Sequence, residues 1–259
     1  MKRTILFLLI IVSLFILNDL NAQTNKVIYT YTKPSWTVGF GPAWNLATND
    51  AYGRANYSTN AQVLRDNYGM RWGWGGYIFG KYSPGKTKAD RIFLGFDYKG
   101  MTNTDFESGA NKTSYDIMTF DAGYEYVFRP GSSSRFWSYY GLGLTGNLIS
   151  GEFIPSNPTA TNFTRNMEST FRVGMEIKAG LEFVINNSKR NLGINVGGRY
   201  NLTNLFNADN ALPTAGQTSN FNLNDGGEAG GPGFKRYIGI FSLDVGLNIY
   251  PDVTKKPIK

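Results

Sequence analysis

The residues of this sequence that could perform catalysis are its acids, serines and lysines, because the chain contains no histidine and no cysteine. Histidine is the commonest metal ligand and a frequent general base, so Ser–His and Cys–His catalysis and a histidine-ligated zinc site are excluded. A Ser–Lys site or a pair of carboxylates stays open, and Asp97, Asp121 and Asp244 are the acids expected at similar depth in the fold. We favour a structural network with basic partners for these acids, and therefore expect no enzyme.

Two further motifs suggest ligand chemistry. Residues 141–146, GLGLTG, match the G-x-G-x-x-G pattern of dinucleotide sites, but that pattern needs a strand-to-helix turn and here it lies inside an alternating segment. In the segment 204–236, Asp209, Asp225 and Glu228 offer the oxygen ligands that calcium prefers, but their spacing matches no calcium-binding loop. We therefore predict no cofactor and no bound metal.

The first 22 residues have the features of an export signal. Two basic residues give a positive start, residues 5–17 form an apolar run, and Leu20 and Ala22 precede a cleavage site before Gln23. The run is too short to span a bilayer comfortably as a helix, although an uncleaved anchor is the alternative. We expect residues 1–22 to be a signal peptide and the remaining chain to be exported.

The elements that must position the chemical residues are long segments in which apolar residues alternate with polar ones. In YIGIFSLDVGLNIY, residues 237–250, the odd positions are mostly apolar and the even positions from Ser242 on are polar or glycine. Successive side chains of a strand point to opposite faces, so this alternation predicts a strand with one apolar face. The pattern recurs in eight segments: 35–46, 68–82, 91–99, 115–128, 136–148, 171–185, 191–203 and 237–250.

The connections between these segments alternate in length. Three are short and rich in turn-forming residues, namely 83–90, 129–135 and 186–190, and four are long, namely 47–67, 100–114, 149–170 and 204–236. Short turns on one side and long loops on the other are typical of an up-and-down barrel. An even number of strands lets the first and last pair antiparallel and close the sheet. The predicted fold is therefore an all-β, eight-stranded antiparallel up-and-down transmembrane β-barrel.

The two faces of the segments differ in charge and in glycine content. The apolar face carries one charge, Asp116, and five glycines, whereas the other face carries fourteen glycines. Small residues leave room for long charged side chains in a lumen that side chains must fill, so we expect the polar face to line the lumen. The expected lumen charge network consists of Arg71, Lys81, Arg91, Asp97, Lys99, Asp121, Glu125, Arg172, Glu176, Lys178, Glu182, Arg199 and Asp244. The alternative fold is a soluble exported ligand-binding barrel.

Strand direction sets rough depths for these charges. The level nearest the short turns is expected to hold Lys81, Arg91, Glu125 and Glu182, and the level nearest the long loops Arg71, Lys99, Arg172, Glu176 and Arg199. Asp97, Asp121, Lys178 and Asp244 are expected between them. Acids and bases meet at each level, as partly buried charges require, so the network is expected to plug the lumen.

Aromatic residues lie near the ends of the segments on the apolar face. Tyrosine and tryptophan favour the membrane interface, where the ring is in an apolar environment and its polar tip meets water. The expected aromatic girdle consists of Trp36, Trp44, Tyr68, Tyr82, Tyr124, Tyr126 and Tyr237. This placement favours a membrane barrel over a soluble one.

With its export signal, eight amphipathic segments, three short turns and four long loops, the sequence resembles the small eight-stranded outer-membrane barrels, the OmpA/OmpX-like class and its PorT-like relatives. The last segment, DVGLNIY at 244–250, is similar to the last-strand signal read by the outer-membrane insertion machinery, although PDVTKKPIK follows it. The resemblance implies an integral outer-membrane protein that contacts outer-membrane lipid and the insertion machinery. Members of the class serve as anchors, adhesins, narrow pores, secretion accessories or lipid-modifying enzymes, and fold alone does not choose among these.

Charge also differs between the two sides of the predicted barrel. The short turns and both termini are net basic, whereas the long loops are slightly acidic. Because the termini share the short-turn side, we expect that side to be periplasmic and the long loops to be extracellular. Solubility and topology alone are the favoured explanation of this basic side, and the alternative is a contact with an anionic periplasmic partner or inner-leaflet headgroups. We expect a periplasmic N-terminal segment at 23–34, the barrel at 35–250 and a basic periplasmic tail at 251–259.

The expected function is a non-enzymatic structural or surface-contact role for a monomer with a plugged lumen and no nucleic-acid partner. The first alternative is a narrow pore for water or small ions. The second is an envelope-assembly or secretion accessory of the PorT-like kind.

Overall fold

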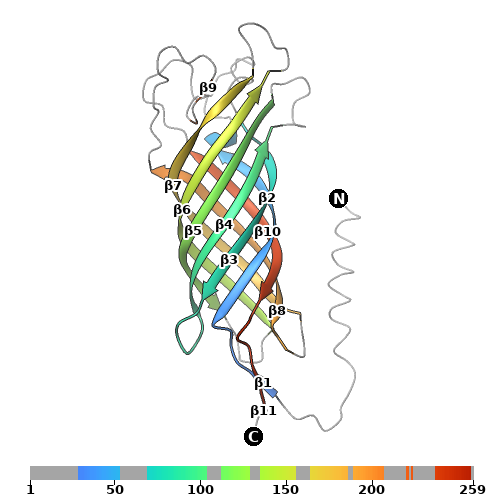
Figure 1. The fold of residues 1–259 in the computed structure, drawn as a ribbon. Helices are drawn as coiled ribbons and strands as arrows, with labels where there is room; N and C mark the ends of the chain where they lie inside the picture. The colour runs from blue at the N-terminus through green and yellow to red at the C-terminus, as the bar shows by residue number, and fades with distance from the viewer. Residues whose placement is uncertain are drawn as a thin grey trace. The chain divides into compact units, whose positions relative to one another are not determined.

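A computed structural model describes residues 29–52, 69–103, 112–128, 135–155, 164–185, 189–206, 220–221, 223 and 237–257. Figure 1 shows a sheet of long tilted strands that curls into a barrel. No helix in the described ranges is both long and apolar enough to cross a membrane. The expected signal peptide at 1–22 lies outside the described residues.

Eight long strands make up the barrel. They are β2 (Trp36–Asn49), β3 (Trp72–Tyr82), β4 (Asp90–Thr102), β5 (Lys112–Phe128), β6 (Phe136–Ile154), β7 (Arg165–Val184), β8 (Leu192–Phe206) and β10 (Ile238–Ile249). They follow the order β6-β5-β4-β3-β2-β10-β8-β7, and a further β6–β7 pairing closes the ring. All eight of these pairings are antiparallel. The predicted eight-stranded antiparallel up-and-down barrel is therefore confirmed.

The outer face of this barrel is apolar. Along β6 the exposed fractions of Tyr140, Leu142 and Leu144 are 53%, 49% and 59%, whereas Thr145 is only 2% exposed. In water, each such apolar side chain would forgo about 1.5–3 kcal/mol of burial free energy, whereas lipid tails are as apolar as leucine. With apolar side chains outside and charges inside, the barrel spans a membrane. The alternative of a soluble barrel with its polar face in water does not hold.

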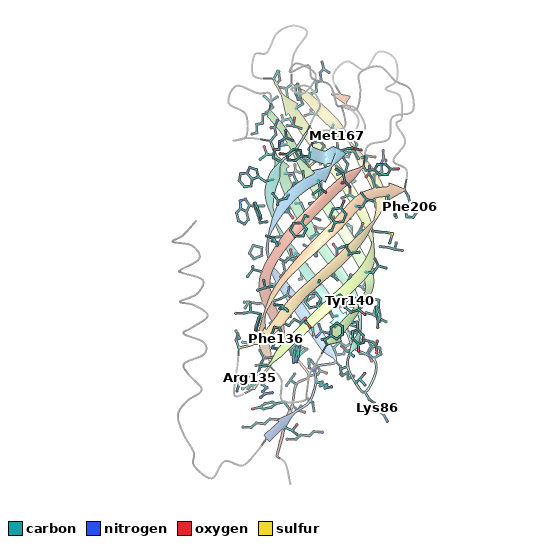
Figure 2. The ribbon with its side chains drawn as sticks, turned by 180° about the vertical axis from the view of Figure 1, so that it is seen from behind. Lys86, Arg135, Phe136, Tyr140, Met167 and Phe206 are labelled. Carbon is teal, nitrogen blue, oxygen red and sulfur yellow. The ribbon has the colours of Figure 1, made fainter. Side chains whose placement is uncertain are left out.

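Aromatic side chains lie at both ends of the apolar face. At the short-turn end, the rings of Trp36 and Tyr82 pack with their centroids 4.6 Å apart across the β2–β3 pair. Figure 2 shows Phe136 and Tyr140 at the same end and Phe206 toward the opposite end. Of the expected girdle, Trp36, Tyr82, Tyr124 and Tyr237 are exposed, Trp44 and Tyr126 are half-buried, and Tyr68 lies outside the described residues.

Strands β6 and β7 continue farther toward the long loops than the sequence pattern predicts. The sequence predicts a loop over 149–170, but β6 runs to Ile154 and β7 begins at Arg165. Along this extension the inward side chains are apolar and the outward ones polar, the inverse of the lipid-facing part. Ile149 and Phe153 are buried, whereas Glu152 is partly exposed. The physical reason is a change of solvent. Beyond the bilayer the outside of the barrel meets water, so the apolar side chains turn inward as they do in a soluble protein.

The inverted alternation builds an apolar core at the long-loop end of the barrel. Its buried members are Ala47, Ala51, Met70, Met101, Tyr115, Ile117, Ile149, Phe153, Met167, Leu223, Ile238 and Ile240. The short helix η2 (Asp50–Tyr52) supplies Ala51, and the predicted long loop 204–236 supplies Leu223. The same loop contains β9 (Asn220–Phe221), which pairs in parallel with β7. Part of this loop is therefore packed structure, and not only a connection.

At the short-turn end, Asp252 ties the segment that follows β10 to the start of β2. Its carboxylate accepts the backbone N–H groups of Ser35 and Trp36 at 2.7 and 3.2 Å. Partial burial tends to raise the pKa of Asp252, but these hydrogen bonds outweigh burial and hold the pKa below its ordinary value. Apart from the barrel, β1 (Tyr29–Tyr31) and β11 (Lys255–Pro257) form a two-stranded sheet.

Candidate functional site

The lumen holds two groups of ion pairs, and the one nearer the short turns is here called the lower cluster. It consists of Lys81, Arg91, Glu125 and Glu182, each at most 2% exposed. Arg91 lies opposite Glu125 in the β4–β5 register, and its Nη1 is 3.0 Å from Glu125 Oε1 and 2.6 Å from Glu182 Oε1. Lys81 Nζ is 2.8 Å from Glu125 Oε2 and 3.4 Å from Glu182 Oε1. Each acid pairs with both bases, and the two acids and two bases leave no net formal charge.

The second group, the middle cluster, lies farther along the lumen. It consists of Asp97, Lys99, Asp121, Glu176, Lys178, Arg199 and Asp244. Arg199 is its centre, because its guanidinium lies 2.9 Å from Asp97 Oδ2, 2.5 Å from Asp244 Oδ2 and 3.5 Å from Glu176 Oε2. Lys99 pairs with Asp97. Lys178 Nζ lies 3.8 Å from Asp121 Oδ2 and 3.9 Å from Glu176 Oε1.

The middle cluster contains four acids and three bases, which gives one excess negative charge when all are ionised. Glu176 is its least satisfied acid, because it is 1% exposed and neither of its carboxylate oxygens accepts a hydrogen bond. Removing an ion from water costs several kcal/mol, and only close, hydrogen-bonded pairing offsets that cost. Arg199 provides such pairing to Asp97 and Asp244. The cluster is therefore stabilised mainly through Arg199 and is weakest at Glu176.

A layer of neutral polar side chains separates the middle cluster from the apolar core. Asn147 Oδ1 accepts hydrogen bonds from Thr119 Oγ1 at 2.9 Å and from Asn201 Nδ2 at 3.1 Å. Asn147 Nδ2 donates to Thr145 Oγ1 at 2.9 Å and to the Thr203 carbonyl at 2.8 Å. Sequence reasoning singled out charges and missed this layer. Their place in the alternation could have revealed them, because these residues lie on the same strand faces as the lumen charges.

Apolar residues fill both ends of the lumen. The core described above lies at the long-loop end, and at the short-turn end Val127, Trp137, Tyr139, Val184 and Tyr250 form a second buried cluster. Tyr250 links this cluster to the ion pairs, because its hydroxyl donates to Glu182 Oε2 at 3.4 Å. A cavity of about 20 Å³ lies among side chains of the two charged clusters, including Lys81, Asp121 and Lys178. That volume suits about one water molecule.

Glycines on the inner face make room for these side chains. A Cβ built on Gly95 would lie 2.1 Å from Asp121 Oδ1, and one on Gly180 would lie 2.5 Å from the Tyr139 hydroxyl oxygen. On the outer face, a Cβ on Gly80 would meet no atom within 4 Å. The expectation that inner-face glycines accommodate large neighbours is thus borne out at Gly95 and Gly180.

Two residues of the expected network lie outside the two clusters, and the expected depths need correction. Arg71 precedes β3, where its guanidinium donates to the Tyr52 carbonyl and stacks 4.0 Å from the centroid of the Tyr52 ring. Arg172 is half-buried opposite Asn147, and its Nη1 donates to Thr170 Oγ1 at 2.5 Å. The other three residues of the expected outer level, Lys99, Glu176 and Arg199, join the middle level in one cluster, because long side chains such as Arg199 reach along the lumen to acids on other strands.

Of the two ligand motifs, one lies in the described part of the chain. GLGLTG lies wholly within β6, where no helix follows it, as the chance-match interpretation expects. Asp209, Asp225 and Glu228 lie outside the described residues. In the part of the chain that the structure describes, no group of three or more acids is arranged to hold a metal ion.

Known proteins offer distant structural matches to this chain. No protein-family model and no curated protein matches the sequence. Among solved structures, Neisserial surface protein A has a TM-score of 0.48 and 15% identity, over 83% of this chain and 97% of its own. Ail, the attachment invasion locus protein of Yersinia pestis, has a TM-score of 0.41 and 15% identity, over 84% of this chain and 100% of its own.

The N-terminal β-barrel domain of Pseudomonas aeruginosa OprF has a TM-score of 0.39 and 13% identity, over 84% of this chain and 100% of its own. The fold assignment itself rests on the strand pairing and the exposed apolar face described above. On that basis the resemblance to the small eight-stranded outer-membrane barrels, which the sequence suggested, is confirmed at the level of architecture.

Proposed function

We propose that this protein is a sealed outer-membrane barrel with a non-enzymatic structural or surface-contact role. The observation that carries the proposal is the continuous stack of filled layers across the lumen: apolar, charged, charged, neutral polar and apolar. A barrel whose interior is packed in this way offers no open channel, so we assign it a structural or surface-contact role. The parts of the chain that face other molecules are then the two ends of the barrel and its lipid-facing wall.

The stack opposes the passage of ions for two physical reasons. An ion that entered would meet the apolar layers first, where the few polar groups are too sparse to replace its hydration shell. It would then have to displace paired side chains such as Arg91 and Arg199, and a charge that loses its partner in a buried site costs about 3–5 kcal/mol. The cavity among the clusters has a volume of about 20 Å³. That volume suits about one water molecule, which is far less than a hydrated ion would need.

Flux through reconstituted vesicles tests the seal. Proteoliposomes loaded with a potassium-sensitive dye should respond to a potassium gradient at the rate of protein-free vesicles. A double variant, Asp121→Ala with Asp244→Ala, leaves the three bases of the middle cluster with two acids and opens space there, so it should raise the rate. A matched surface variant, Asp116→Ala, changes an acid on the outer face that accepts the Tyr98 hydroxyl, and should leave the rate at background. Rapid flux through the wild type would support the narrow-pore alternative instead.

The proposed topology places the long loops outside the cell and both termini in the periplasm. It is supported by the general arrangement of outer-membrane barrels, which have short periplasmic turns and longer extracellular loops. The extension of β6 and β7 adds that water surrounds the long-loop end. Protease added to intact cells should therefore cut within 204–236 and leave the short turn at 83–89 intact. Cleavage of that turn in unbroken cells would reverse the proposed orientation without affecting the seal.

A further inference from the structure

Basic side chains gather at the short-turn end of the barrel, just beyond its lipid-facing wall. We call this set the basic collar; it consists of Lys33, Lys86, Lys88, Arg135, Lys189 and Arg190. The described acids at this end are engaged elsewhere, because Asp252 accepts backbone N–H groups and Asp90 accepts the Tyr124 hydroxyl. The collar therefore gives this end of the barrel a positive surface.

The collar lies at the depth of lipid headgroups. Arg135 directly precedes Phe136, whose side chain is 42% exposed on the wall, and Lys86 follows the wall residue Tyr82 by four positions. Figure 2 shows Lys86 and Arg135 at the end of the barrel where Phe136 and Tyr140 lie. Headgroups add about 5–7 Å on each side of the hydrocarbon, and long basic side chains reach several ångströms along apolar surface to place their charge. Headgroup phosphates are thus the anions within reach.

Three lysines of the collar, Lys33, Lys86 and Lys88, retain donors for an anion. Lys33 Nζ donates to the Thr87 carbonyl at 3.1 Å, and Lys88 Nζ donates to the Ser83 carbonyl at 2.8 Å. An ammonium group has three N–H donors, so each contact fixes the charge on the turn and leaves further donors. Among the ion pairs within the described ranges, none includes Lys33, Lys86 or Lys88.

The two arginines of the collar come from adjacent turns. The Val184 N–H group donates to the Arg135 carbonyl at 2.8 Å, which ties the segment before β6 to the end of β7, where the turn with Arg190 begins. Partial burial and the nearby charge of Arg135 lower the pKa of Arg190. Guanidinium binds phosphate in a bidentate geometry, so an arginine at this end of the barrel is suited to a headgroup phosphate.

We propose that the basic collar binds the phosphates of anionic lipid headgroups in the leaflet at the short-turn end. The proposal depends on the barrel spanning a membrane, but not on which side of the membrane the turns face or on the seal of the lumen. An acidic soluble partner is the rival occupant. Lipid is favoured because the charges adjoin the wall, where headgroup phosphates are already present at high local concentration.

The test measures which lipids the barrel retains. The full mature chain is reconstituted in vesicles of equal parts phosphatidylcholine and phosphatidylglycerol, extracted gently, and examined by native mass spectrometry. We expect phosphatidylglycerol to be enriched over phosphatidylcholine several-fold, and the pair Lys86→Gln with Arg135→Gln to reduce the enrichment. A single base near an anionic leaflet contributes up to about five-fold, so the pair should cause a several-fold fall, and 0.5 M salt should do the same to the wild type.

The matched control changes one lysine and one arginine at the opposite end of the barrel, Lys112→Gln with Arg165→Gln, and should leave the enrichment unchanged. Equal retention of both lipids by the wild type, or equal loss in the two double variants, would overturn the proposal. Binding of soluble poly-glutamate through the collar without any lipid preference would also overturn it and favour an acidic protein partner. Vesicle flux, measured on the same variants, reports separately on the seal.

Discussion

Replacing Arg199 by methionine should destabilise the barrel more than any single change of a surface base. The guanidinium of Arg199 closes ion pairs with three acids from three other strands. Without it, four acids share the cluster with two lysines, and Asp244 has no other ion pair among the described residues. Removing one partner of a buried ion pair costs about 3–5 kcal/mol, because the remaining charge stays buried and uncompensated. Arg199→Met should therefore lower the free energy of unfolding by at least about 3 kcal/mol.

Urea unfolding of the barrel in vesicles, followed by the fluorescence of its five tryptophans, measures this change. The matched control is Arg172→Met on β7, because Arg172 is half-buried and forms no ion pair within the described ranges. Substitutions away from buried networks usually stay within about 0.5 kcal/mol, so the control should remain near the wild type. Similar losses of stability for the two variants would show that the middle cluster is not held through Arg199.

A second arginine variant separates lost charge from lost packing. Arg199→Met combined with Asp244→Asn restores the wild-type excess of one negative charge in the middle cluster. If unpaired charge is the cause of the loss, the double variant should be more stable than Arg199→Met alone by about 1 kcal/mol or more. Additive losses would instead assign the effect of Arg199 to its packing in the lumen.

Three further predictions test other parts of the description. Glu176→Gln should cost less stability than Asp97→Asn in the same urea assay, because it removes the excess negative charge where no hydrogen bond is lost. Gly95→Ala should slow or reduce folding into vesicles, because its Cβ would lie 2.1 Å from a carboxylate oxygen, whereas Gly80→Ala on the outer face should fold like the wild type. Asp252→Ala should destabilise the barrel near neutral pH. Because the native pKa of Asp252 is depressed, the stability that its carboxylate contributes is complete above its unfolded pKa of about 4 and is lost as the pH falls through the lower native value. The free energies of unfolding of wild type and variant should therefore converge in acid.

The sequence was sufficient for the fold because the lipid and lumen faces impose a strict period of two. Leu144 and Thr145 show this directly, because adjacent residues of one strand are 59% and 2% exposed, as alternation requires. The short turns were predictable for a related reason, since glycine, proline and asparagine cluster where the alternation stops. These signals are local in the chain and need no knowledge of distant contacts.

The ends of the strands and the partners within the lumen required the structure. From Ile149 on, the inward side chains are apolar and the outward ones polar, because water replaces lipid outside the barrel. A prediction that keeps the apolar residues on the outer face therefore ends the strand at this point, although the strand continues. The partners of Arg199 lie on β4, β7 and β10, and the length of an arginine side chain allows several depths. The burial of Leu223 depends on how a long loop folds back, which no periodic pattern in 204–236 reveals.

Single-channel recording in planar bilayers tests the sealed lumen most directly. Purified wild-type barrel, shown to be folded and inserted, should give no steady conductance steps in 1 M potassium chloride at moderate voltage, beyond brief events at the noise level. The variant Asp121→Ala with Asp244→Ala should give measurable openings under the same conditions, because it loosens the middle cluster. Large and steady steps from the wild type would contradict the proposed seal, which depends on the apolar clusters at the two ends of the lumen and on the charged clusters between them.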